Sequence, residues 1–145
     1  MKFVIGIDPG RSKVGLALLT AEGRLVERRI VARNEASEAV ANLARRDEAA
    51  IAMGDGTEAK SLVEELMHCG KLPSGCQIMM VDESDSTTEG RRLFLMDNRD
   101  CLLSRLIPIG LRSPGRPWDD YVAEVIARRY LEALKHGGSM KDKLE

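Results

Sequence analysis

The sequence has few aromatic residues and no excess of charge of either sign. Only 3% of its 145 residues are aromatic, which argues against an RNA-binding platform that stacks bases on aromatic side chains. Its 22 lysines and arginines are offset by 23 aspartates and glutamates, so the formal net charge is −1. The molecule as a whole therefore has no attraction to nucleic acid, and any attraction must come from local basic patches.

Cysteines and long apolar runs are also scarce. Cys69, Cys76 and Cys101 are odd in number and have no Cys-x-x-Cys spacing, which fits neither a disulfide framework nor a zinc site and indicates reduced thiols. No apolar run reaches membrane-spanning length, and the amino terminus lacks the basic-then-apolar pattern of a signal peptide. We therefore expect a cytoplasmic protein that does not contact membranes.

The length fits one domain, which we place at residues 1–136, followed by a disordered tail at residues 137–145. Apolar runs bounded by turn residues predict strands at 3–7, 14–19, 25–32, 49–53 and 76–81. Apolar residues at helical spacing predict helices after the N-caps Asn34 and Thr57, and at 85–96, 102–107 and 118–135. This order predicts an α/β fold: a mixed five-stranded sheet, three antiparallel strands and then parallel ones, with helices on both faces.

Acidic residues follow two of the buried strands abruptly. Asp8 comes directly after the first apolar run, and Asp82-Glu83 comes directly after the run Ile78–Val81. A carboxylate gains nothing from an apolar core and must lie near solvent or a cation. The carboxyl ends of parallel strands meet at one edge of an open sheet, where such sheets bind ligands. Taken alone, each acid is explained as a turn or helix-capping residue.

A third acidic position begins the last predicted helix. Asp119-Asp120 stands at its amino end, where a carboxylate also complements the helix dipole. Carboxylates gathered together repel one another and raise one another's pKa unless a cation neutralises them. Oxygen ligands without histidine or cysteine suit Mg²⁺ or Mn²⁺. We expect residues 8, 83 and 119 to meet at one rim of the sheet, and a lysine or arginine filling the gap between them would contradict this interpretation.

Three short motifs resemble those of a known family. They are Ile7-Asp8-Pro9-Gly10 with Lys13-Val14-Gly15 and Ala17; Asp82-Glu83 with Thr87-Thr88; and Asp119 with Ala123, Ile126, Tyr130 and Leu131. In this order and spacing, the sequence resembles the YqgF/RuvX family of the RNase H-like nuclease superfamily, and its opening is also similar to the RuvC resolvases. The resemblance implies an RNase H-like fold and a metal-dependent nuclease.

The sequence departs from the family pattern at two places. Ser84 stands where the family has an arginine, and an extra residue displaces Thr87-Thr88. The longer loop of the family after the fourth strand is reduced to Gly54-Asp55-Gly56-Thr57. These changes keep the acidic residues but alter the expected substrate contacts, so the sequence is a divergent one.

The resemblance also implies roles for individual residues. The catalytic residues would be Asp8, Glu83, Asp119 and Asp120, of which Asp8, Glu83 and Asp119 would hold Mg²⁺ or Mn²⁺. Two such ions activate a water and stabilise charge on both oxygens exchanged in phosphodiester hydrolysis. The predicted substrate contacts are Gly10, Lys13, Arg112 and Arg116, with Gly15 giving phosphates access to the backbone. A solvated hairpin explains Lys13 equally well, and Trp118 is better explained as an anchor on the sheet than as a base-stacking residue.

The function expected from this resemblance is hydrolysis of structured nucleic acid. We favour processing of pre-ribosomal RNA over Holliday-junction resolution, because one small domain need not be a symmetric resolvase. A catalytically inactive nucleic-acid-binding protein of the same fold is a further alternative. The sugar kinase and actin class is disfavoured, since it needs two copies of this fold and the chain has length for one. The sequence leaves the choice between a monomer and a weak homodimer open.

Overall fold

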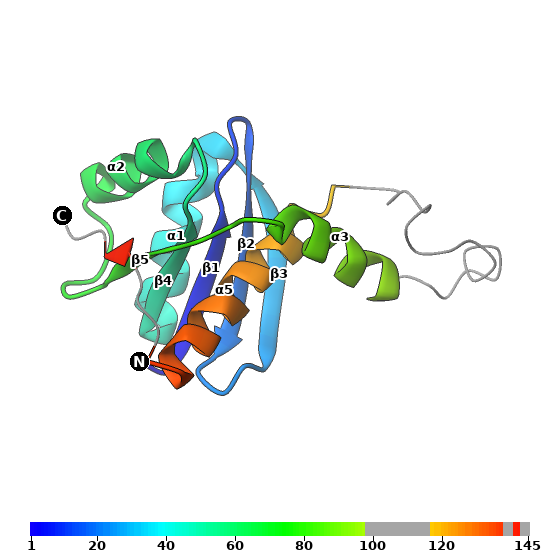
Figure 1. Cartoon of the computed structure of the whole chain (residues 1–145). Coiled ribbons are helices and arrows are strands. Elements are labelled where there is room, and N and C mark those ends of the chain that lie inside the picture. Colours follow the sequence, from blue (N-terminus) through cyan, green and yellow to red (C-terminus); the bar gives the residue numbers. More distant parts are fainter. Residues whose placement is uncertain (98–116, 138–140, 143–145) are drawn as a thin grey trace.

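The structure, a computed structural model, describes residues 1–97, 117–137 and 141–142. Its sheet has the strand order β3-β2-β1-β4-β5-β6, with helices on both faces (Figure 1). The strands are β1 (Phe3–Asp8), β2 (Lys13–Thr20), β3 (Leu25–Ala32), β4 (Ala49–Gly54), β5 (Ile78–Val81) and β6 (Lys141–Asp142). β1, β2 and β3 form an antiparallel meander, whereas β4 and β5 continue the sheet parallel to β1. The predicted mixed α/β sheet is confirmed.

The sixth strand is absent from the sequence prediction. β6 pairs antiparallel with β5, with Met80 opposite Lys141 and Met79 opposite Asp142. It lies within the predicted disordered tail, so two residues of that tail belong to the sheet. A strand of two residues has too few positions to show an alternating pattern, and its sequence therefore carries no signal.

The described helices are α1 (Arg33–Asp47), α2 (Ala59–Cys69), α3 (Ser86–Asp97) and α5 (Asp119–Lys135). Both predicted N-caps are wrong, because α1 follows Ala32 and α2 follows Glu58, neither with a capping side chain. The amide of Arg33 instead donates to the carbonyl of Ser12 at 2.9 Å, which satisfies one N–H group of the first turn of α1. The predicted helix at 102–107 lies outside the described residues. None of the described helices is long and apolar enough to cross a membrane.

The two faces of the sheet have separate apolar cores. On one face, strand residues such as Ile5 pack against Val40 of α1 and Leu62 of α2. On the other face, strand residues such as Val4 pack against Ile126 of α5. Because side chains alternate along a strand, every second residue of β1 faces α5.

Gly6 of β1 allows α5 to come very close to the sheet. A Cβ at this position would lie 2.1 Å from the carbonyl oxygen of Ala123 and 2.9 Å from the Cβ of Ala127. The absent side chain of Gly6 and the small side chains of α5 together set this short separation. The close packing places the amino end of α5 beside the carboxyl end of β1.

The helix α3 packs mainly against α5 and projects beyond the sheet (Figure 1). The ring of Phe94 meets that of Tyr121 edge to face, with the centroids 5.2 Å apart. Gly90 of α3 lies against Val122 of α5, where a Cβ on the glycine would be 2.6 Å from Val122 Cγ2. The contact is therefore a close helix pair with its own small apolar cluster.

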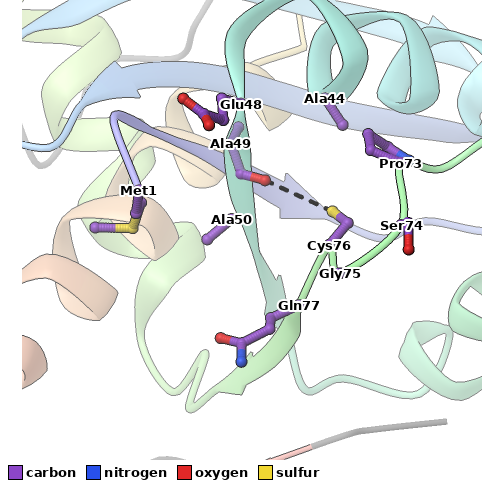
Figure 2. Close-up of a pocket in the computed structure, with 10 residues that line it drawn as sticks. All are labelled: Met1, Ala44, Glu48, Ala49, Ala50, Pro73, Ser74, Gly75, Cys76 and Gln77. Atoms are coloured by element: carbon purple, nitrogen blue, oxygen red, sulfur yellow. Dashed lines mark hydrogen bonds between the residues drawn. The ribbon is translucent and has the colours of Figure 1, made fainter.

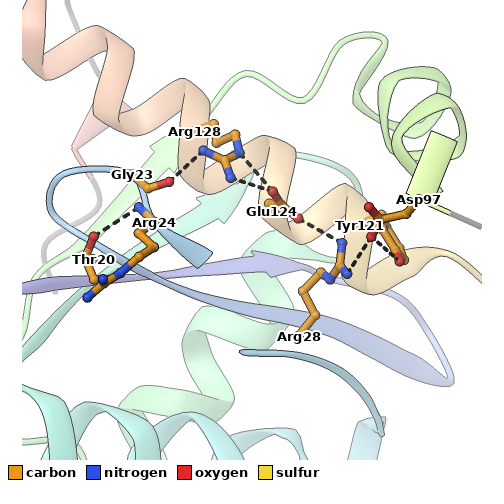
Figure 3. Close-up of polar contacts among 8 residues, drawn as sticks. All are labelled: Thr20, Gly23, Arg24, Arg28, Asp97, Tyr121, Glu124 and Arg128. Carbon is orange, nitrogen blue, oxygen red and sulfur yellow. Dashed lines mark hydrogen bonds and ion pairs between the residues drawn. The ribbon is translucent and has the colours of Figure 1, made fainter. Parts of the chain in front are cut away.

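A chain of charged groups joins β3, α5 and α3 (Figure 3). Glu124 is buried and accepts hydrogen bonds from Arg28 at 3.0 Å and from Arg128 at 2.7 Å. Arg28 also donates to Asp97 at 3.0 Å and lies 3.6 Å from the centroid of the Tyr121 ring. Because the carboxylate of Glu124 has an arginine on each side, its burial is compensated by hydrogen-bonded charge.

Candidate active site

The three predicted acids come from three elements that end or begin at the same rim of the sheet. Asp8 is the last residue of β1, Glu83 stands two residues beyond β5, and Asp119 is the first residue of α5. Asp8 lies on the face that α5 covers, because it alternates in step with Val4. The negative charges of Asp119 and Glu83 both act on Asp8. We call these three residues the acidic rim.

Glycines on the two neighbouring strands make this arrangement possible. Gly15 pairs with Asp8 across β1 and β2, and a Cβ on Gly15 would lie 2.0 Å from the carbonyl oxygen of Asp119. Gly54 ends β4 on the other side of β1, and a Cβ there would lie 2.7 Å from Glu83 Oε1. The space at Gly15, which the sequence analysis assigns to a substrate phosphate, is thus filled by α5.

Burial and nearby negative charge raise the pKa values of two carboxyl groups of the rim, those of Asp8 and Asp119. The pKa of Asp8 is raised from 3.8 to about 7, first by burial and then by the negative charges of Asp119 and Glu83. The pKa of Asp119 is also raised, mainly by burial, although the nearby ammonium of Lys13 opposes the shift. A cation among these oxygens would favour the ionised form of each group.

A short loop after β4 orients Glu83, a role that was not predicted from the sequence. The amide of Gly56 donates to Glu83 Oε1 at 2.8 Å, and the amide of Glu83 donates to Asp55 Oδ1 at 3.2 Å. A Cβ on Gly56 would lie 2.7 Å from Glu83 Oε2. The loop that the sequence analysis describes as shortened therefore orients the acid. Two glycines flanking Asp55 directly after a strand are the signal that points to this contact.

Lys13 and Gly10, two predicted substrate contacts, lie in or beside the turn between β1 and β2. The ammonium of Lys13 is 3.8 Å from Asp119 Oδ2, and its side chain is 47% exposed. Gly10 is required by the turn itself, since a Cβ there would lie 2.3 Å from the carbonyl oxygen of Lys13. Binding of a phosphate by either residue remains a prediction.

The remaining predicted site residues are Asp120, Arg112 and Arg116. Asp120 lies in the first turn of α5 and is buried, and its charge contributes to the raised pKa of Asp119. Arg112 and Arg116 lie outside the described residues. Trp118 packs against the apolar residues of both α5 and α3 and donates to the carbonyl of Thr87 at 3.1 Å, which agrees with its role as an anchor.

Oxygen ligands alone are present in the acidic rim, and this donor set fits Mg²⁺ or Mn²⁺. Within residues 1–97, 117–137 and 141–142, however, no three Asp, Glu, His or Cys side chains are already arranged to hold an ion. Glu83 is turned toward the Gly56 amide and Asp119 toward Lys13. A cation would therefore have to draw the side chains of Glu83 and Asp119 toward Asp8, which is partly buried at the end of β1.

A cavity of about 240 Å³ lies at the opposite end of the parallel strands (Figure 2). Its lining includes Ala49 at the start of β4 and Cys76 shortly before β5. The thiol of Cys76 donates to the carbonyl of Ala49, and burial raises its pKa, which disfavours a reactive thiolate. Among the described residues that line it, Glu48 is the only one with a carboxylate, which pairs with Lys2 at 3.7 Å. The chemistry of the acidic rim has no counterpart in this cavity.

Neither protein-family models nor curated proteins match this sequence. Among solved structures, the chain is similar to RuvC of Thermus thermophilus, with 18% identity, a TM-score of 0.63, and coverage of 97% of this chain and 99% of that chain. It is also similar to T. thermophilus RuvC in complex with a Holliday junction substrate, with 18% identity, a TM-score of 0.60, and coverage of 99% and 100%. The expected RNase H-like fold is therefore confirmed.

Proposed function

We propose that this protein is a divalent-metal-dependent nuclease that hydrolyses phosphodiester bonds in branched DNA. The observation that carries the proposal is the acidic rim, where burial and neighbouring carboxylates raise the pKa values of Asp8 and Asp119, because perturbed pKa values of this kind are typical of functional sites. The RNase H-like fold and the similarity to RuvC along both chains support the same function.

The residues of the rim suit this chemistry. Asp8, Glu83 and Asp119 would hold Mg²⁺ or Mn²⁺, which supplies an activated water and stabilises charge on the reacting phosphate. Asp8 is partly buried on the α5 face, which raises its pKa, and the Gly56 amide binds one carboxylate oxygen of Glu83, so that the other oxygen could contact an ion. Asp120, at the same end of α5, would orient a water rather than contact an ion.

Substrate binding would rest on the residues around this rim. Lys13 is placed to exchange its weak pairing with Asp119 for a phosphate, since its ammonium lies at the edge of the site. Gly10, Arg112 and Arg116 are the other proposed contacts. Contacts to the backbone of this kind give salt-dependent affinity with little sequence specificity.

Branched DNA has better support as the substrate than ribosomal RNA. One similar structure is described as RuvC in complex with a Holliday junction substrate, which favours the alternative of the sequence analysis over its first choice. Processing of pre-ribosomal RNA now rests on the resemblance to YqgF/RuvX alone. Whether the protein acts as a monomer or a weak homodimer, and in the cytoplasm, stays a prediction.

A nucleic-acid-binding protein without nuclease activity is the second candidate, and one contact favours it. Lys13 already supplies a positive charge to Asp119, and a basic residue between the acids would argue against hydrolysis. The contact is a single one at 3.8 Å, and the pKa of Asp119 stays raised despite it. An exposed pair of this kind is weak enough for a divalent cation to displace.

Labelled substrates separate these functions. The wild-type protein and Asp8→Asn are incubated with a four-way DNA junction, a matched linear duplex and a structured RNA, each with Mg²⁺, Mn²⁺ or EDTA. We expect cleavage of the junction by the wild type with either metal and none by Asp8→Asn, whose circular dichroism matches the wild type. Cleavage of RNA alone would instead assign the protein to RNA processing. Binding of the junction without cleavage in either metal would identify the inactive binder.

A further inference from the structure

The turn between β1 and β2 is held by an arginine from another element. We propose that Arg33 is a positioning residue, which fixes this turn so that Lys13 can meet the substrate backbone; the inference rests on the proposed function. Arg33 is the first residue of α1, and its side chain is only 15% exposed. Arg33 belongs to none of the sequence motifs.

All five N–H groups of the Arg33 guanidinium have an acceptor. Nη1 donates to the carbonyl of Gly10 at 2.7 Å and to Glu58 at 3.0 Å. Nη2 donates to Ser61 at 3.0 Å and to Glu65 at 2.6 Å, and Nε donates to Glu65 at 3.2 Å. A planar fork with five donors satisfies this set, whereas the ammonium of a lysine has three donors at one point. The site is therefore built for arginine.

The charge of Arg33 is already matched where it lies. Glu58 immediately precedes α2 and Glu65 lies within it, and both carboxylates contact the guanidinium. A guanidinium with two carboxylate partners has no net charge to offer a phosphate. Its effect on a nucleic acid must therefore pass through the turn that it holds and not through direct contact.

Arg33 donates two hydrogen bonds to the turn between β1 and β2. Its side chain binds the carbonyl of Gly10, and its backbone amide binds the carbonyl of Ser12 at 2.9 Å. The turn starts directly after Asp8 and leads into Lys13, whose ammonium reaches the acidic rim. Because the turn is closed tightly around Gly10, a shift of Gly10 also moves Lys13. Because Arg33 also contacts α2, the position of α2 affects where Lys13, a proposed substrate contact, lies.

The test compares Arg33→Lys with Arg46→Lys, a matched change in the last turn of the same helix. Arg46 is 57% exposed and pairs with Glu27 at 3.1 Å, far along α1 from the turn. For Arg33→Lys we expect the KM for a four-way DNA junction to rise about tenfold, with kcat within about threefold of the wild type. A tenfold change corresponds to about 1.4 kcal/mol, which is close to the free energy of one hydrogen bond to a charged group. Arg46→Lys should match the wild type in both constants.

Amide hydrogen exchange of residues 10–13 gives a second measurement that needs no substrate. In Arg33→Lys we expect faster exchange in this turn while the amides of α2 keep their protection. Unchanged exchange, or faster exchange with an unchanged KM, would overturn the inference. So would an equal loss in kcat and KM that follows the folded fraction, because that pattern marks a purely structural role. If the wild type neither binds nor cuts nucleic acid, the proposed function fails. The exchange data still show whether Arg33 holds the turn between β1 and β2.

Discussion

Gly15 lies opposite Asp8 across the β1–β2 hairpin, and the space above Gly15 is filled by the backbone of Asp119. A Cβ at Gly15 would lie 2.0 Å from that carbonyl oxygen and 2.9 Å from the amide nitrogen of Asp120. Neither group is the end of a flexible side chain, so α5 itself would have to shift. Gly15 thus allows Asp119 to lie close to Asp8, because it has no side chain of its own.

Gly15→Ala should therefore damage both stability and the site. We expect a loss of about 2–3 kcal/mol in the free energy of unfolding, measured with urea, because the added methyl overpacks a rigid contact. Cleavage should fall further than the folded fraction explains, since Asp119 moves with α5. Val14→Ala is the control, because it weakens the core on the other face of β2 without touching Asp119. Equal specific activity of the two variants would contradict the prediction.

Removing the charge of Asp8 should change how stability depends on pH. The folded-state pKa of about 7 lies above the ordinary aspartate value of 3.8, so the folded protein binds more protons between these values and its stability falls as pH rises from about 4 to 7. In EDTA, Asp8→Asn should remove this fall and be more stable than the wild type above pH 7 by roughly 2–4 kcal/mol. Glu22→Gln, an exposed change, should leave the pH profile intact. If the stability of the wild type and of Asp8→Asn depended on pH in the same way, folding would not raise the pKa of Asp8.

A divalent cation should stabilise the wild type through the same carboxylate. Mg²⁺ or Mn²⁺ at about a hundred times its Kd adds about 2.7 kcal/mol to the free energy of unfolding. The gain should grow with pH up to about 7, since protons and the cation compete for Asp8. Thermal unfolding with and without EDTA measures the effect. An equal rise of Tm in Asp8→Asn would place the ion elsewhere.

The loop after β4 offers a change that acts on Glu83 alone. In Gly56→Ala the new methyl would overlap the carboxylate of Glu83, which must turn away. We expect activity or metal affinity to fall about 10- to 100-fold, the range for groups that orient a metal ligand. Stability should change little, because the displaced group is the end of a side chain. Thr57→Ala, one residue further and exposed, is the control. Wild-type activity in Gly56→Ala would show that this orientation is unimportant.

Glu124→Gln tests the charged network that joins α5 to its neighbours (Figure 3). The substitution leaves Arg28 and Arg128 facing a neutral amide, and breaking a buried ion pair in this way costs about 3 kcal/mol. The midpoint of urea unfolding should fall accordingly. Glu132→Gln changes an exposed acid on the same helix and should have little effect. A loss in Glu124→Gln no greater than in Glu132→Gln would mean that water replaces the pairing.

The fold was predictable because its signals are local. The turn at Pro9-Gly10, between two apolar runs, marks the first hairpin, and the abrupt acids Asp8 and Glu83 mark the ends of parallel strands. The family motifs then point to Asp119 among several acids of α5. In each case, neighbouring residues carry the information, and the sheet only has to bring the ends together.

The missed residues depend on partners far away in the sequence. Arg33 meets acceptors in the β1–β2 turn and in α2, and Glu124 meets Arg28 of β3. As sequence, each is one more charged residue among many. The contact of Gly56 with Glu83 has the same character, since neither residue predicts the other without the sheet between them.

Asp8 and Asp119 lie far apart in the sequence, so Asp8 is synthesised well before Asp119. Domains fold as units during translation, and α5 is the only described helix that covers its face of the sheet, so the emerging meander has an open apolar face until α5 leaves the ribosome. The rim is incomplete for the same period. A partly made chain therefore lacks Asp119, one of the three carboxylates that the proposed cation site requires, and this site can form only once α5 has packed on the sheet.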